Sequence, residues 1–182
     1  MSFEQRNWRI LMDIRSTSLA LALAACLAPC AAAAGDPFAT GAMPVPANRI
    51  VGVWDNAAYV GPCGGTPSAT PARQTVVFHA GGTFLDNARY PPQGIATPNG
   101  TMQRSIGVGS WEYSPRTGRW SLEQRFDFFK NNVYDGYQVI SRSSILLSSD
   151  GKTMAGPVHA YRYDAAGTLV LEQCGTATAT RL

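Results

Sequence analysis

The sequence is poor in charge and in histidine. Only 15% of its 182 residues are charged, and the formal net charge is +3. A disordered chain would carry more charge and fewer aromatic residues than the 10% present here, so the composition indicates a folded domain. Such a small net charge gives no electrostatic reason to expect a nucleic-acid partner.

The sequence also lacks the short motifs that identify common catalytic and cofactor sites. It contains no Gly-x-Ser-x-Gly, His-Glu-x-x-His or Cys-x-x-Cys. The Gly-Lys-Thr at 151–153 resembles the end of a phosphate-binding loop, but Leu146 stands where that loop needs its first glycine. Because His79 and His159 are the only histidines, we expect no metal site, and nothing indicates a cofactor.

The first 34 residues are typical of an export signal. Arginines precede an apolar run of Leu and Ala over 19–27, and small residues follow it up to Ala34. The run is too short to predict a membrane span. Translation from Met12 instead of Met1 would preserve this pattern, because Arg15 alone supplies a compact basic segment.

The mature protein is expected in the bacterial envelope or outside the cell. Cleavage after Ala34 predicts a periplasmic or secreted protein. The segment 23–26 resembles a lipobox, so an outer-membrane lipoprotein acylated at Cys26 is the alternative. The Pro-rich segment 35–48 predicts a flexible linker, and residues 49–182 form the expected domain.

Only two cysteines remain after the signal segment, Cys63 and Cys174. An even pair in an oxidising compartment predicts one disulfide bond. The alternative is two separately buried thiols.

The expected domain reads as strands without a helix. Eight strand-like runs are separated by turn residues, such as the Asp-Gly at 150–151. They are expected at about 50–60, 73–79, 83–90, 104–114, 119–129, 137–148, 153–163 and 168–180. Their regular spacing suggests a sandwich or an up-and-down barrel with short links at one end and mostly long links, at 61–72, 91–103 and 130–136, at the other.

The clearest alternation, over residues 119–128, predicts which side chains face inward. A four-residue turn at 115–118 is expected to pair Tyr113 with Trp120, Trp111 with Leu122 and Gly109 with Gln124. The inner face of this hairpin is expected to hold Trp111, Tyr113, Trp120, Leu122, Gln124, Phe126 and Phe128. Gln124 is a lone amide among aromatic rings, so it needs a polar partner or a ligand. Gln124, Phe126 and Phe128 are the first candidates for a pocket wall, with Trp111 and Trp120 beside them. Plain core packing of these rings is the alternative.

Gly-Val-Trp at 52–54 resembles the Gly-x-Trp signature of lipocalins and related calycins. In that family the Trp closes the bottom of an eight-stranded antiparallel barrel, and an Arg near the chain end packs across it. The resemblance implies an all-β, eight-stranded antiparallel up-and-down barrel in which Trp54 and Arg181 have these roles. A disulfide between the first and last strands would place Asn56 opposite Arg181.

Arg142, His159 and Glu172 form the best enzyme-like constellation. Short turns are expected to place them abreast on neighbouring strands, and a histidine oriented by a carboxylate is a candidate general base. The opposite faces of these strands look more apolar, with Val139, Ile145, Leu147, Met154, Val158, Ala160, Leu169 and Leu171. The triplet is therefore expected to form a solvent-facing ladder.

Three functions follow from these observations. The leading prediction is an exported barrel that binds a small hydrophobic ligand in its lumen without catalysis. The second is a barrel cyclase or isomerase of the allene oxide cyclase or dirigent type, with His159, Glu172 or Glu112 pointing into the lumen. The third is an envelope structural or protein-binding module that uses its loops or outer face.

Overall fold

The computed structural model describes residues 46–182, most of which lie in β-strands. The elements are η1 Pro46–Ile50, β1 Gly52–Pro62, β2 Ala72–Phe78, β3 Thr83–Ala88, β4 Ile95–Thr97, β5 Gly100–Arg104, β6 Gly107–Ser114, β7 Arg119–Lys130, β8 Val133–Leu147, β9 Thr153–Tyr163 and β10 Leu169–Arg181. The expected signal segment, Cys26 and residues 35–45 of the expected linker lie outside the described residues. Residues 46–48 at the end of that linker belong to η1.

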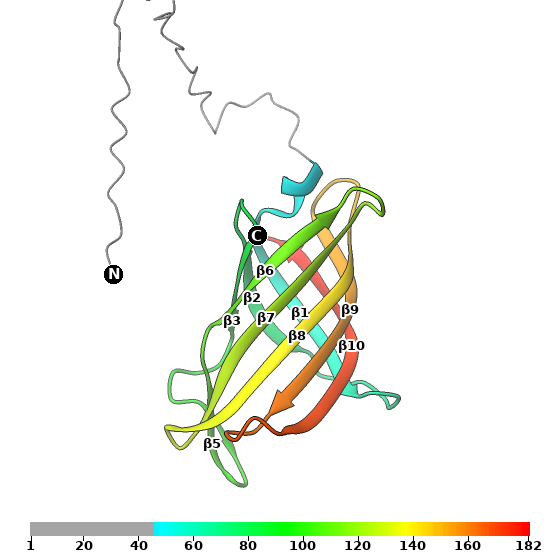
Figure 1. Ribbon diagram of the computed structural model, residues 1–182. Helices are drawn as coiled ribbons and strands as arrows, with labels where there is room; N and C mark the ends of the chain where they lie inside the picture. Colours follow the sequence, from blue (N-terminus) through cyan, green and yellow to red (C-terminus); the bar gives the residue numbers. More distant parts are fainter. Residues whose placement is uncertain (1–45) are drawn as a thin grey trace, which may run out of the picture. The chain divides into compact units, whose positions relative to one another are not determined.

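Eight antiparallel strands close into a barrel (Figure 1). Their order is β7-β6-β3-β2-β1-β10-β9-β8, and β8 pairs back with β7. Closure leaves none of these eight strands as an open sheet edge, which removes the usual template for edge-to-edge aggregation. The predicted all-β, eight-stranded up-and-down barrel is confirmed, and the sandwich alternative is wrong.

The register of the β6–β7 hairpin follows the sequence prediction. Trp111 pairs with Leu122, Tyr113 with Trp120, and Gly109 with Gln124. Position 109 requires glycine, because a side chain there would collide with the backbone carbonyl of Glu123. The strands therefore approach closely where a larger residue would push them apart.

Two expected long loops are more ordered than the sequence suggested. Residues 95–104 form the short β4–β5 hairpin, which pairs with the end of β7 beyond the end of β6. The expected loop at 130–136 is instead a tight turn at Asn131 and Asn132, both with positive φ. Asparagine tolerates this left-handed conformation, so β7 and β8 extend further than expected.

One end of the barrel is plugged by η1 and an apolar cluster. The cluster comprises Ile50, Trp54, Val76, Phe78, Phe84, Trp111, Trp120, Leu122, Ile145, Met154 and Ala179. The Trp54 indole donates to the Ile50 carbonyl oxygen, and the Trp120 indole donates to that of Ala47, each over 2.9 Å. These bonds fix η1 across the barrel end, so we call it the plugged end.

Arg181 closes the plugged end from the last strand, as the resemblance implies. Its guanidinium carbon lies 4.2 Å from the centre of the Trp54 ring. It also donates to the backbone carbonyls of Val51, Arg49 and Gly151. Trp54 itself pairs with Arg181, and Asn56 pairs with Ala179, so the predicted register is wrong by two residues.

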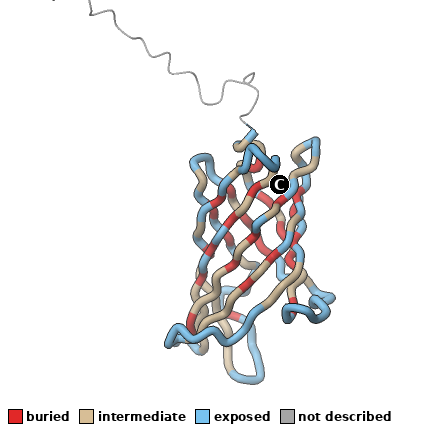
Figure 2. The backbone as a smooth tube through the Cα atoms, turned by 45° about the vertical axis from the view of Figure 1, so that its right-hand side comes forward, coloured by how far each residue is buried: buried red, intermediate tan, exposed pale blue. Residues whose placement is uncertain are grey.

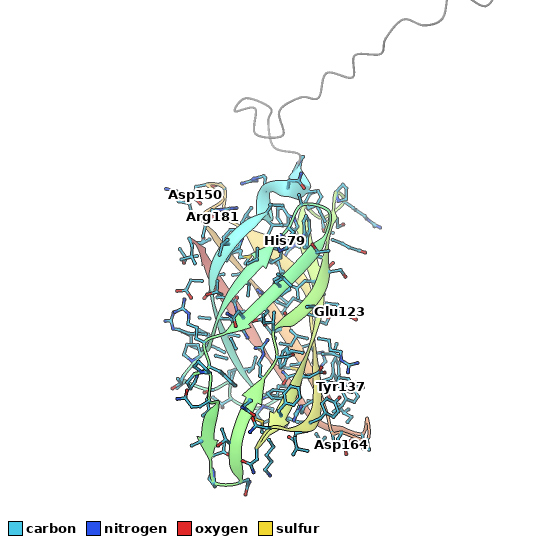
Figure 3. All side chains as sticks on the ribbon, turned by 90° about the vertical axis from the view of Figure 1, so that its left-hand side faces the viewer. His79, Glu123, Tyr137, Asp150, Asp164 and Arg181 are labelled. Carbon is cyan, nitrogen blue, oxygen red and sulfur yellow. A yellow bond between two sulfur atoms is a disulfide. The ribbon has the colours of Figure 1, made fainter. Side chains whose placement is uncertain are left out.

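The opposite end, here called the mouth, carries the loops at 63–71, 89–94 and 164–168 (Figure 3). A second apolar cluster lies on this side of the lumen, formed by Ala58, Phe126, Ile140, Val158, Ala160 and Ala177. Buried and exposed residues alternate along the strands (Figure 2). This period of two separates a lumen face from an outer face on each strand.

Candidate functional site

A belt of polar side chains crosses the lumen between the two apolar clusters. It consists of Asn56, Gln74, Asp86, Arg104, Gln124, Gln138 and Arg142, contributed by β1, β2, β3, β5, β7 and β8. Five of the seven residues are less than 9% exposed, and only Arg104 and Gln138 are more accessible as whole residues. Buried polar groups cost free energy unless they are paired, so the belt marks the lumen as a candidate binding site.

A cavity of about 70 Å³ lies within this belt. Its polar lining is Asn56, Gln74, Gln124, Gln138 and Arg142. Alanines at 58, 72, 160 and 177 line it as well, and their short side chains leave the space open. This volume holds a few water molecules or a very small ligand, and it falls below the roughly 300–1,000 Å³ of sites for drug-sized molecules.

Arg142 reaches the cavity because β8 contains an irregularity. The ladder between β8 and β9 shifts register between Ser141 and Leu146. Ile140 and Arg142 are buried on one side of the shift and Ile145 on the other, so the inward positions change from even to odd numbers. A one-residue irregularity reverses the facing of every side chain beyond it. The prediction that Arg142 faces solvent is therefore wrong.

The Arg142 guanidinium is buried without a counter-ion. Its side chain donates from Nη2 to the Ala177 carbonyl oxygen over 3.2 Å, and Nε has no protein partner. No carboxylate among residues 46–182 forms an ion pair with it. Burial lowers the pKa of Arg142 to about 10, because desolvation disfavours the charged form.

The other buried arginine beside the lumen is paired. Arg104 Nη2 lies 2.9 Å from Asp86 Oδ2, and Gln124 Nε2 donates to the same oxygen over 3.0 Å. The Arg104 guanidinium also lies over the Phe126 ring, 3.5 Å from its centre. Asp86 is therefore the polar partner that the sequence required for Gln124, and the buried charge sums to one positive charge on Arg142.

Several belt atoms lack a hydrogen-bond partner among residues 46–182. They are Asn56 Oδ1, Asp86 Oδ1, Gln124 Oε1, Arg104 Nε and Arg142 Nε. Native proteins pair nearly all such buried atoms. Of these residues, Asn56, Gln124 and Arg142 line the cavity, so it offers unpaired acceptors and an unpaired donor to whatever occupies it.

The five predicted pocket residues divide between the cavity and its surroundings. Gln124 lines the cavity. Phe126 belongs to the mouth-side cluster and Phe128 packs against it, while Trp111 and Trp120 belong to the cluster at the plugged end. Sequence reasoning missed Asn56, Gln74, Gln138 and Arg142. For Asn56 a signal was present, since it occupies the inward position between Trp54 and Ala58 in the period-two pattern of β1.

His159 and Glu172 lie on the outer wall, as expected. Their side chains are 38% and 46% exposed, and His159 Nε2 lies 2.6 Å from Glu172 Oε1. The expected pairings of His159 with Arg142 and Glu172 are wrong, because the ladder sets His159 opposite Ser141 and Cys174. Glu112 is also exposed, so none of the three residues required by a barrel enzyme points into the lumen.

Several apolar residues near the mouth also differ in burial from what the sequence predicted. Leu169 and Leu171, expected in the interior, are 47% and 43% exposed, and β10 has a register irregularity between them. Ile140 is buried, whereas its neighbour Val139, which was expected in the interior, is only partly buried. Both differences arise because the period of two is broken where a strand bulges.

The predicted disulfide between Cys63 and Cys174 is confirmed. It joins the residue that follows β1 to the middle of β10 across 111 residues of sequence. The bond reinforces the β1–β10 pairing, which closes the barrel.

Replacing both Cys63 and Cys174 with serine is expected to lower the free energy of unfolding by about 2–5 kcal/mol, because the unfolded chain gains the freedom of a long loop. Urea unfolding followed by tryptophan fluorescence measures the change. Reduced wild-type protein serves as the control and should unfold at the same urea concentration as the double variant. An unchanged midpoint in the variant would show that β1–β10 pairing alone holds the closure.

The chain matches no family model, and neither a curated protein nor a solved structure matches it. Within residues 46–182, no helix is long and apolar enough to cross a lipid bilayer.

Proposed function

We propose that this chain is a calycin-like barrel that binds a small acidic ligand in its lumen and performs no catalysis. The observation that carries the proposal is Arg142, a buried guanidinium that lines a cavity and has no counter-ion. The ligand we infer has a short apolar body and one carboxylate. It refines the expected small hydrophobic ligand by adding the charge that the lumen requires.

A carboxylate suits the Arg142 site for three physical reasons. It neutralises the single unpaired charge of the lumen. Its two oxygens match the planar fork of donors on a guanidinium, of which Nε has no protein partner. The interaction is also stronger in a buried site than in water, because the effective dielectric constant is lower.

The remainder of the cavity suits a short apolar body. Ala58, Val60 and Val158 line it towards the mouth, while the plugged end is closed by the cluster around Trp54. A ligand whose carboxylate meets Arg142 would therefore extend towards the mouth. The cavity also reaches Ala72, at the start of β2 and directly after the mouth loop 63–71, which gives a route of entry.

Thermal unfolding of the oxidised protein tests this proposal with butyrate as the probe and butanol as the neutral control. We expect the unfolding midpoint to rise with butyrate concentration and to saturate, since a ligand that binds only the folded state stabilises it by mass action. Butanol lacks the charge that Arg142 recognises and should have little effect. Sodium chloride at the same ionic strength controls for general salt effects.

Arg142→Met is expected to abolish the butyrate-dependent rise. Without ligand, the same variant should be more stable than wild type by roughly 1–3 kcal/mol, because it removes an uncompensated buried charge. Arg125→Met is the matched control, since Arg125 is 54% exposed on the outer wall. Equal stabilisation of wild type and Arg142→Met by butyrate would overturn the carboxylate assignment, and stabilisation by neither probe would overturn ligand binding.

Export rests on the sequence pattern of residues 1–34 and is part of the proposal. We propose a periplasmic or secreted protein, with lipidation of Cys26 and outer-membrane attachment as the alternative. The intact mass of protein purified from the cell envelope tests this. A mass beginning at residue 35 supports simple cleavage, a diacylglycerol adduct at Cys26 supports the lipoprotein, and a full-length chain overturns both.

The two alternative functions have weaker support. A barrel cyclase or isomerase needs acid–base groups in the lumen, whereas His159, Glu172 and Glu112 lie outside it. A protein-binding module would use the loops or outer wall, and a partner that co-purifies with the envelope protein would favour it.

A further inference from the structure

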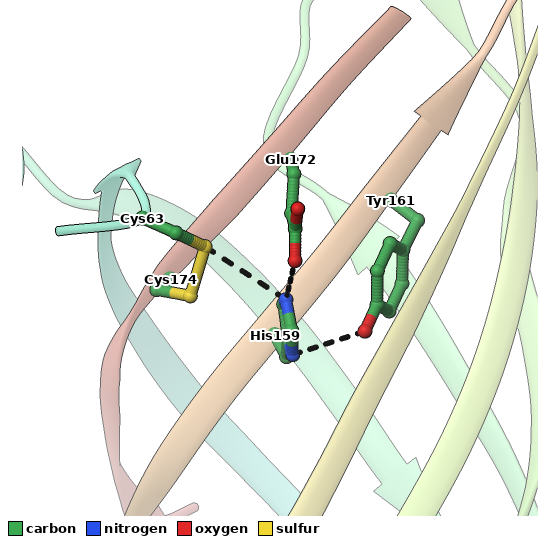
Figure 4. Close-up of a disulfide and its surroundings, with 5 residues drawn as sticks. All are labelled: Cys63, His159, Tyr161, Glu172 and Cys174. Carbon is green, nitrogen blue, oxygen red and sulfur yellow. Dashed lines mark hydrogen bonds and ion pairs between the residues drawn. A yellow bond between two sulfur atoms is a disulfide. The ribbon is translucent and has the colours of Figure 1, made fainter. Parts of the chain in front are cut away.

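His159 and Glu172, whose side chains are of kinds that bind metal ions, lie beside the Cys63–Cys174 disulfide (Figure 4). This cluster is on the outer wall and is separate from the lumen. His159 Nε2 lies 3.7 Å from Cys63 Sγ and 2.6 Å from Glu172 Oε1. The two sulfur atoms and the nearer imidazole nitrogen all lie within 4.8 Å of one another. A structural disulfide alone requires neither the imidazole nor the carboxylate.

We propose that reduction of the Cys63–Cys174 bond converts this cluster into a Zn²⁺ site. The ligands would be the two thiolates, His159 Nε2 and the Glu172 carboxylate. Zn²⁺ binds four ligands of this kind in tetrahedral geometry. The 3.7 Å between His159 Nε2 and Cys63 Sγ already suits two donors of one zinc ion, whereas the two bonded sulfur atoms must separate. The site goes beyond the proposed ligand-binding function and uses none of its residues.

The barrel places three of the four ligands in fixed positions. Cys174 is directly opposite His159 in the β9–β10 ladder, and Glu172 precedes Cys174 by two residues on the same face of β10. Cys63 lies just beyond the end of β1, so it can move apart from Cys174 when the bond opens. Backbone movement is then needed only at Cys63, while the exposed Glu172 side chain can turn to widen its distance from His159, which limits the entropic cost of assembling the site.

Tyr161 gives His159 the orientation that a metal ligand needs. Its hydroxyl lies 3.1 Å from His159 Nδ1, and the two rings pack 4.4 Å apart between centres. When Nε2 binds zinc, the Nδ1–H would donate to the Tyr161 oxygen. Partners of this kind fix the ring of a ligating histidine and typically change metal affinity by about 10–100-fold.

The conversion needs a dithiol reductant. The dithiol supplies two electrons and two protons, the Cys63–Cys174 bond breaks into two thiols, and the dithiol closes into its own disulfide. Zn²⁺ then displaces both thiol protons into solvent, while His159 binds in its neutral form. The exposed position of Cys63 leaves the bond open to the reductant. In both states the barrel closure stays clamped, by sulfur–sulfur bonding or by the metal.

Co²⁺ is the probe for the test because it reports thiolate ligands and tetrahedral geometry by visible absorption. The mature protein, which begins at residue 35 and has Cys63 and Cys174 as its only cysteines, is reduced with dithiothreitol, desalted without oxygen and titrated with Co²⁺. We expect one Co²⁺ per chain, intense tetrahedral bands and a thiolate charge-transfer band, all bleached by one equivalent of Zn²⁺. The oxidised protein should show none of these. Absence of the bands in the reduced protein would overturn the proposal.

Variants show whether the barrel assembles the site. His159→Ala and Glu172→Gln are each expected to weaken Co²⁺ binding at least 10-fold, whereas Glu112→Gln, an exposed glutamate elsewhere on the outer wall, should leave it unchanged. Unaltered affinity in His159→Ala would show that two thiols bind the metal without the cluster, and would overturn the proposal. Arg142→Met should leave metal binding intact, so failure of the lumen site and of the zinc site can be told apart.

Circular dichroism controls for loss of the fold on reduction. If the reduced chain keeps its β-sheet signal, the titration is read directly. If reduction unfolds it, Zn²⁺ is expected to restore the oxidised spectrum at one equivalent, because a metal that binds the folded site stabilises it. An unfolded reduced chain that zinc does not refold would count against the site.

Discussion

Replacing Trp54 with alanine is expected to lower the free energy of unfolding by about 3–5 kcal/mol. Trp54 has no exposed surface and belongs to the cluster that plugs one end of the barrel. The substitution leaves a cavity, removes the indole donor to the Ile50 carbonyl, and removes the ring against which Arg181 packs. Urea unfolding at several protein concentrations measures the loss.

Two further variants divide the Trp54 effect into packing and hydrogen bonding. Trp54→Phe keeps an aromatic ring but removes the indole N–H, so it should lose less than the alanine variant. Val53→Ala is the matched surface control, because Val53 is 41% exposed on the other face of β1, and it is expected to change stability by less than about 1 kcal/mol. A loss of under 1 kcal/mol for Trp54→Ala would show that η1 and Arg181 close this end without the indole.

Much of the fold was predictable because local signals fix β-hairpins. The alternation over 119–128 and the turn at 115–118 fixed which residues of β6 and β7 meet. The two cysteines indicated that the first and last strands lie side by side, which is the step that closes the barrel. The exact register of β1 against β10 could not be predicted, since a disulfide to a residue beyond β1 is compatible with registers that differ by two positions.

The candidate site was less predictable because it depends on an irregularity. Nothing in the residues around Ser143 and Ser144 marks the register shift in β8, and without it Arg142 is assigned to the outer wall. A charged side chain is expected outside, and period-two reasoning had no cause to place it inside. The short β4–β5 hairpin was not predicted for a related reason, because a strand of three residues is too short to show alternation.

The division of the lumen into layers links stability to the proposed function. The plugged end holds the larger rings, including Trp54, Trp111 and Trp120, whereas the middle layer holds the amides and buried charges. The tightly packed cluster at the plugged end stabilises the folded barrel and so offsets the free-energy cost of burying the polar belt. Proteins commonly tolerate such a cost where a binding site needs it.

Replacing Asp86 with alanine is the second change expected to have a large effect, with a loss of about 3–5 kcal/mol. Asp86 is fully buried and accepts hydrogen bonds from Arg104 and Gln124. Without it, the Arg104 guanidinium becomes a second unpaired buried cation in addition to that of Arg142, and Gln124 loses its partner. Thermal and urea unfolding at low and high salt measure the loss, which salt should hardly reduce because the charges are buried.

The double variant Asp86→Leu with Arg104→Met separates the cost of an orphaned charge from the value of the pair itself. Removing both charges leaves no unpaired cation at this position, so the double variant is expected to be closer in stability to wild type than Asp86→Ala is. If it is instead the less stable of the two, the Asp86–Arg104 pair contributes net stability. The carboxylate site should persist in the double variant, because Arg142 would still be the unpaired positive charge facing the cavity.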